Sequence, residues 1–123
     1  VNDAKPRWVA SEILRALNGL EDREIIIFGL AFKPNVDDFR GSPALEVATL
    51  VMAEAPSVKV CVVEPYITAE KLEVILPGAT LIQLRDALLK KCPSFMLVNH
   101  DLFADEGCSK LSSLESFCCD SCA

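Results

Sequence analysis

Two cationic side chains lie in a segment that could bind an anion. Lys33 and Arg40 stand between an unbroken apolar run at residues 25–30 and Ser42-Pro43, a pair typical of a helix start. In α/β proteins a loop between a buried strand and a helix N-terminus often receives phosphate, because backbone N–H groups and the helix dipole favour negative charge there. Two cations also stand out in a chain whose net charge is -6. The sequence therefore predicts an anion site at this loop.

The same segment contains two adjacent carboxylates, Asp37 and Asp38. Surface ion pairs with Lys33 and Arg40 would account for all of these charges without a ligand, since exposed ion pairs are common and energetically minor. The spacing leaves this alternative open. A magnesium site on the two aspartates is a weaker hypothesis, because aspartates in such loops usually form turns and helix caps. We expect no metal here.

Other motifs of enzyme sites are incomplete. Gly29 stands alone where the dinucleotide fingerprint G-x-G-x-x-G requires two more glycines. His100 is the sole histidine and follows a short apolar run, but it has no paired nucleophile with which to form a hydrolytic triad. We expect a hydrogen-bonded loop histidine, with a catalytic His100 as the alternative.

The six cysteines do not predict a disulfide scaffold. Cys61 and Cys92 lie among apolar neighbours, and the other four crowd between Cys108 and Cys122. The sequence Cys118-Cys119-x-x-Cys122 could bind zinc, but it has no second ligand pair at suitable spacing. Since the chain has enough Ile, Leu and Val for a core, we expect free thiols in a reducing compartment.

Composition indicates one soluble, acidic domain. The 123 residues are 51% apolar and 24% charged, which suits a globular core. A net charge of -6 argues against nucleic acid or an anionic membrane as the main partner. No apolar run reaches the ~20 residues of a membrane span, and the first residues lack a secretion signal. We expect a cytoplasmic protein and, because the chain begins with Val, a piece of a longer one.

Helix-like and strand-like patterns alternate along the chain. Apolar spacing predicts an opening helix that starts near Pro6 and stops at Asn18-Gly19. Strand and helix patterns then follow one another, with strands at residues 25–30, 58–63, 80–82 and 95–98 and helices at 42–55, 69–76 and 84–91. This alternation predicts an α/β fold, a Rossmann-like three-layer domain with a mainly parallel sheet. In such a sheet ligands bind beyond the carboxyl ends of the strands, here the loops 31–41, 64–68 and 99–103.

Four segments resemble one family of proteins. Residues 28–46, FGLAFKPNVDDFRGSPALE, resemble the signature that opens the C-terminal UDP-binding domain of UDP-glucose/UDP-N-acetyl-D-mannosamine 6-dehydrogenases. Residues 1–9 (VNDAKPRWV), 63–67 (VEPYI) and 97–103 (LVNHDLF) are similar to further family segments in the same order. The resemblance is greatest to the UDP-N-acetyl-D-mannosamine dehydrogenases and covers residues 1–103. It implies an interdomain helical segment at 1–20, a UDP-sugar-binding domain at 21–103 and an atypical tail at 104–123.

The resemblance also implies a division of labour. Such enzymes act in polysaccharide biosynthesis and oxidise the sugar 6-hydroxymethyl group to a carboxylate, with NAD held mainly by an N-terminal domain and with the nucleophilic Cys upstream of this segment. Phe32 and Lys33 would contact the UDP-sugar, and Arg40 would reach NAD. The full-length protein would be a homodimer, and this chain alone would be inactive. The alternatives are a UDP-glucose or UDP-N-acetylglucosamine 6-dehydrogenase domain, or a stand-alone nucleotide-binding or dimerisation module without catalysis.

The sequence departs from the family pattern at several positions. Gly41 replaces a Glu, and Tyr66 and Asn99 replace the commoner Asn and Asp. Nothing after Phe103 resembles the family's closing strand or its substrate-contacting basic residue. We therefore expect a sheet that lacks this strand.

Overall fold

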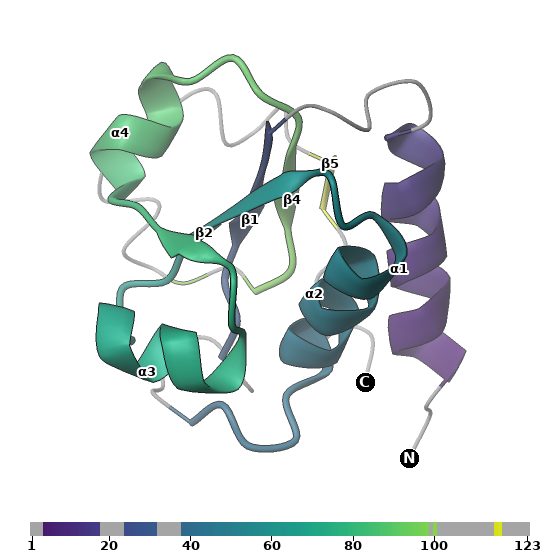
Figure 1. The fold of residues 1–123 in the computed structure, drawn as a ribbon, viewed down its shortest axis with the longest axis horizontal. Coiled ribbons are helices and arrows are strands. Elements are labelled where there is room, and N and C mark those ends of the chain that lie inside the picture. The colour runs from purple at the N-terminus through teal and green to yellow at the C-terminus, as the bar shows by residue number, and fades with distance from the viewer. Residues whose placement is uncertain (1–3, 18–23, 32–37, 99, 101–114, 117–123) are drawn as a thin grey trace.

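The fold is known from a computed structural model, which describes residues 4–17, 24–31, 38–98, 100 and 115–116. Five parallel strands form one sheet in the order β3-β2-β1-β4-β5 (Figure 1). The strands are β1 (Glu24–Phe28), β2 (Lys59–Val63), β3 (Thr80–Leu81), β4 (Ser94–Met96) and β5 (Glu115–Ser116). The helices are α1 (Ala4–Ala16), α2 (Pro43–Glu54), α3 (Ala69–Ile75) and α4 (Leu84–Leu89).

The predicted parallel α/β architecture is confirmed. β1 pairs in parallel with β2 along its whole length, from Glu24 opposite Lys59 to Phe28 opposite Val63, and with β4 on its other side. The unbroken apolar runs of β1 and β2 arise because a central parallel strand is covered by helices on both faces.

Each face of the sheet has its own apolar cluster, which makes the domain three-layered. On one face, Ile25 and Ile27 of β1 share a core with buried side chains of α1, α2 and α3. On the other face, Ile26 and Phe28 pack with Ala87 of α4. The alternation of β1 side chains between two cores follows from the period of two in a strand.

The two central strands end earlier than their apolar runs. β1 stops at Phe28 because Gly29 has φ +92°, a conformation that ends the extended ladder. β4 stops at Met96, after which the N–H groups of Leu97 and Val98 both donate to the Phe28 carbonyl, at 2.9 and 3.3 Å. The apolar residues beyond these ends, Leu30, Leu97 and Val98, lie outside the strands but remain buried.

The expectation of a missing closing strand is wrong. β5 lies parallel to β4, with Phe95 opposite Glu115 and Met96 opposite Ser116. Two residues are too few for a period-two pattern, and the pairing depends on the open backbone edge that β4 offers, so the sequence pattern does not reveal it. Residues 101–114 and 117–123, with the four C-terminal cysteines, lie outside the described residues. The proposed domain boundaries remain predictions.

A charged cluster covers the start of β1. The Glu24 carboxylate accepts a hydrogen bond from the Cys61 thiol at 2.9 Å and lies 3.2 Å from Lys90 Nζ and 3.7 Å from Lys59 Nζ. Burial, then the neighbouring carboxylate, raises the pKa of Cys61 to about 11, so this thiol stays protonated at neutral pH. Cys92 Sγ lies 3.6 Å from the other oxygen of the same carboxylate, so both described cysteines contact Glu24.

The lowered pKa of Glu24 should make the free energy of unfolding depend on pH. The hydrogen bond from Cys61 and then the two lysines lower the pKa of Glu24 from 4.5 to about 2 in the folded state. A carboxyl whose folded pKa is depressed stabilises the fold above its ordinary pKa, and this contribution disappears as the pH falls from about 4.5 toward 2. We expect the difference in unfolding free energy between the parent and Glu24→Gln to shrink over that window, as measured by urea unfolding. A difference that does not change with pH would contradict this. Glu73→Gln, on an exposed residue, is the control.

Among the described residues, no helix has the length and apolar character of a membrane span.

Candidate functional site

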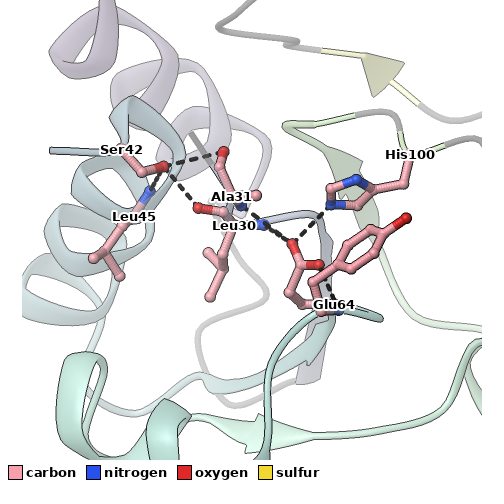
Figure 2. A network of polar contacts seen from close by, with 7 residues as sticks. Leu30, Ala31, Ser42, Leu45, Glu64 and His100 are labelled. Atoms are coloured by element: carbon pink, nitrogen blue, oxygen red, sulfur yellow. Dashed lines mark hydrogen bonds and ion pairs between the residues drawn. The ribbon is translucent and has the colours of Figure 1, made fainter. Parts of the chain in front are cut away.

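A buried carboxylate occupies the carboxyl edge of the sheet. Glu64 follows β2 directly and is 3% exposed. Its Oε1 accepts hydrogen bonds from the backbone N–H groups of Leu30 at 2.8 Å and Ala31 at 3.1 Å, and it lies 2.9 Å from Nε2 of His100 (Figure 2). Its Oε2 accepts from the N–H of Tyr66 at 3.0 Å. The three loops expected at the ligand edge thus meet at one side chain.

Four polar groups surround the Glu64 carboxylate. The backbone N–H groups of Leu30, Ala31 and Tyr66 donate to its oxygens, and Nε2 of His100 lies 2.9 Å from Oε1. His100 is fully buried, and the Tyr66 ring lies edge-on to it with 4.9 Å between ring centroids. The expectation of a hydrogen-bonded loop histidine is confirmed. Burial and this partner suit a structural role for His100.

Ser42 joins the far end of the segment to the same place. It caps α2, accepting from the N–H of Leu45 at 3.2 Å, and Pro43 occupies the first helical turn as predicted. Its hydroxyl donates to the carbonyl of Leu30 at 2.7 Å, with the carbonyl of Ala31 at 3.3 Å (Figure 2). The two ends of the segment that carries Lys33 and Arg40 are therefore in direct contact.

Of the predicted site residues, the structure describes Arg40 and not Phe32 or Lys33. Phe32, Lys33 and Asp37 lie outside the described residues. Arg40 is described, and its side chain is 93% exposed with Nε 3.3 Å from Oδ1 of Asp38. This hydrogen bond is the main cause that lowers the pKa of Asp38. The surface ion pair considered as the alternative is thus present for Arg40, but so exposed a pair is weak enough for a ligand to replace.

A pocket of about 420 Å³ lies beside this ion pair. Two cations, Arg40 and Lys71, line it together with one carboxylate, Asp38. Gly41, also in the lining, has φ +65°, and no atom lies within 4 Å of the place a Cβ would take. The pocket therefore has room and a positive balance of charge, which suits an anionic group.

Sequence reasoning missed two residues of this edge, Glu64 and Lys71. Glu64 had a signal, because an acidic residue directly after a buried strand needs donors from neighbouring loops. Lys71 had none, since a lysine in the first turn of an exposed short helix is usually solvated. The structure places Lys71, in the first turn of α3, in the lining of the same pocket as Arg40.

The described residues contain no group of three or more His, Cys, Asp or Glu side chains arranged to hold a metal. Asp38, one of the two aspartates considered for magnesium, is paired with Arg40.

Comparison with known proteins shows the family of this chain. Residues 26–118 match the UDP-glucose/GDP-mannose dehydrogenase family, UDP binding domain. The chain belongs to this family. The match includes the loop from β1 to α2, Glu64 and His100, and it extends past residue 103 to include β5.

Individual relatives agree with the family match. The UDP-N-acetyl-D-mannosamine dehydrogenase of Escherichia coli K12 is 42% identical over 112 residues, which cover 84% of this chain and 26% of the relative. The NDP-N-acetyl-D-galactosaminuronic acid dehydrogenase of Ralstonia nicotianae is 37% identical over 114 residues, which cover 92% of this chain and 26% of the relative. The chain thus spans about a quarter of the length of these dehydrogenases.

Solved structures of the family share the fold. A UDP-glucose dehydrogenase from the archaeon Pyrobaculum islandicum superposes with a TM-score of 0.68 and 30% identity, covering 83% of this chain and 23% of that one. A UDP-N-acetyl-mannosamine dehydrogenase from Staphylococcus aureus superposes with a TM-score of 0.60 at 22% identity, covering 80% of this chain and 22% of that one, and supports the fold alone.

Proposed function

We propose that this chain is the UDP-sugar-binding domain of an NAD-dependent nucleotide-sugar 6-dehydrogenase that oxidises UDP-N-acetylmannosamine to its uronate. The observation that carries the proposal is 42% identity to a UDP-N-acetyl-D-mannosamine dehydrogenase across 84% of the chain. The convergence of three loops on Glu64, at the edge where α/β sheets bind ligands, supports it. UDP-glucose is the second candidate substrate, because the archaeal UDP-glucose dehydrogenase superposes well.

Within this domain the segment from β1 to α2 makes the ligand contacts. Phe32 and Lys33 contact the UDP-sugar, and Arg40 contacts NAD, since both molecules carry a diphosphate that a local cation recognises. The full protein is a cytoplasmic homodimer whose catalytic thiol and main NAD-binding domain precede this chain.

Arg40 and its neighbours fit a contact with one phosphate group of NAD better than a full dinucleotide-binding site. The exposed guanidinium of Arg40, beside Lys71 and a hollow at Gly41, suits one phosphate group. Gly29 does not suit a dinucleotide cradle, because Val98 packs against it and the fingerprint glycines are absent. When bound, NAD would supply the hydride acceptor, and this chain would supply charge that orients it.

Replacing Lys33 tests the substrate contact. In the intact enzyme, Lys33→Ala should lower kcat/KM for the UDP-sugar about 10- to 150-fold. This factor corresponds to a loss of ~1.5–3 kcal/mol in transition-state stabilisation, the scale of one hydrogen bond to a charged group. The melting temperature should change little. Lys91→Ala, which removes an exposed lysine from a loop before β4, is the matched control. An unchanged kcat/KM in Lys33→Ala would contradict the assignment.

This chain alone should not catalyse oxidation. The reaction needs a bound nicotinamide and a thiolate held against the sugar. Cys61 is buried, has a pKa of about 11 and contacts Glu24 at the opposite edge of the sheet. We expect no NADH absorbance above a heat-denatured control when the chain is mixed with NAD and UDP-N-acetylmannosamine or UDP-glucose. Turnover that thiol alkylation abolishes would overturn this expectation.

Titration with UDP separates this proposal from a purely structural module. We expect weak UDP binding, because a single domain forms one wall of the cleft. A dimerisation module would show none.

A further inference from the structure

The pocket beside Arg40 combines apolar and cationic side chains. Its volume is about 420 Å³, within the ~300–1,000 Å³ that is typical of small-molecule sites. Three apolar residues of its lining, Phe39, Leu45 and Ile75, belong to the core between the sheet, α2 and α3 or pack against it. Arg40 and Lys71 add two positive charges. This lining suits a phosphate group that is attached to an organic molecule.

The backbone of Lys71 is held in place although its side chain is exposed. Its N–H donates to Oγ1 of Thr68, the N-cap of α3, at 3.2 Å. The next residue, Leu72, is only 1% exposed and packs in the core. The Lys71 side chain therefore starts from a fixed point at the pocket, and a ligand would have to order only its own rotamers.

The charges in the described lining are not balanced. Asp38 pairs with Arg40, with 3.3 Å between Oδ1 and Nε. Within the part of the chain that the structure describes, no carboxylate forms an ion pair with Lys71. The hydrogen bonds from Arg40 and, to a smaller extent, the charge of Lys71 lower the pKa of Asp38, so both cations act on one carboxylate. Asp38 is thus an internal anion of a pocket that keeps a positive balance.

We infer that Lys71 and Arg40 together bind one phosphate group of NAD, and that this phosphate replaces Asp38 as the partner of Arg40. The inference rests on the proposed contact of Arg40 with NAD. The exchange costs little, because the side chain of Arg40 is 93% exposed and such exposed pairs are weak. A phosphate group can also accept from a guanidinium and an ammonium at once, which adds the charge of Lys71 to the contact.

NMR titration of the 123-residue chain with NAD tests the role of Lys71. We expect Lys71→Ala to raise the Kd for NAD about fivefold, the upper scale for an exposed charge pair. The Kd for UDP should stay the same, because the proposed UDP contacts lie elsewhere. Lys91→Ala, which removes an exposed lysine outside the pocket, is the matched control and should leave both values unchanged.

Asp38→Asn tests the exchange of partners. It keeps the shape of the side chain but removes the charge that competes with the phosphate, so the Kd for NAD should fall about threefold. In the Arg40→Ala background the same change should alter the Kd by less than about 1.5-fold, because no guanidinium is left to compete for. Asp86→Asn, the same change on an exposed residue of α4, should have no effect.

The outcomes distinguish this inference from the proposed function. An unchanged Kd for NAD in Lys71→Ala, or an equal rise for NAD and UDP, would overturn the role of Lys71 and leave the Arg40 contact standing. An equal effect of Asp38→Asn in both backgrounds would mean that Asp38 only repels the ligand, and would overturn the exchange. A parent chain that does not respond to NAD, or binds it as well after Arg40→Ala, would overturn the proposed NAD contact and this inference with it.

Discussion

Replacing Gly29 with alanine is expected to lower the free energy of unfolding by about 3 kcal/mol or more. A Cβ at this position would lie 2.3 Å from the carbonyl oxygen of Val98 and 2.7 Å from its Cβ. The Val98 backbone is fixed by its hydrogen bond to Phe28 and cannot yield cheaply. Overpacking costs ~1–3 kcal/mol, and the positive φ of +92° adds a further ~1–2 kcal/mol for a residue with a side chain.

Gly41→Ala is the matched control for this experiment. Gly41 also has a positive φ, +65°, but nothing lies within 4 Å of its missing Cβ. Its substitution should therefore cost only the backbone part, ~1 kcal/mol. Equal losses at the two glycines in urea unfolding would show that close packing against Val98 is not the reason for a glycine at position 29.

Replacing Glu64 with leucine is expected to cost ~3–5 kcal/mol, the scale for removing one partner from a buried charged network. Three backbone N–H groups would lose their acceptor, two of them buried, and the buried His100 ring would lose its partner. A typical domain is stable by only ~5–15 kcal/mol, so such a loss brings the chain close to unfolding.

The check on this expectation is again urea unfolding, with Glu73→Leu as the control. Both substitutions remove one negative charge, but Glu73 is exposed on α3. We expect the control to change stability by less than ~0.5 kcal/mol, as is usual for surface positions. A similar loss of stability in Glu64→Leu and Glu73→Leu would mean that the loss comes from the changed net charge and not from the hydrogen bonds to Glu64.

These expectations place two sensitive positions at the carboxyl edge of the sheet. Gly29 brings the end of β1 against β4, and Glu64 brings the end of β2 to the same place. His100 completes the contact from the β4 side. The segment from β1 to α2 thus starts from the junction of three strands, which is a rigid support for the diphosphate contacts proposed for it.

The sequence by itself determined the parts of this protein that depend on local patterns. The apolar runs of β1 and β2 predicted buried parallel strands, and Ser42-Pro43 predicted the start of α2. Both are confirmed, because burial on two faces and helix capping leave their marks within a few consecutive residues. The motif at residues 28–46 likewise indicated the family, because its residues are consecutive in the chain and their order is enough to identify it.

Tertiary structure alone decided which distant residues meet. Glu64 reaches Leu30 across 34 positions and His100 across 36, and these contacts depend on the strand order β2-β1-β4, which local patterns do not specify. The same holds for β5, whose two residues pair with an edge formed elsewhere in the chain. Contacts of this kind are made only when the strand ends converge, so a local pattern does not say which residues meet.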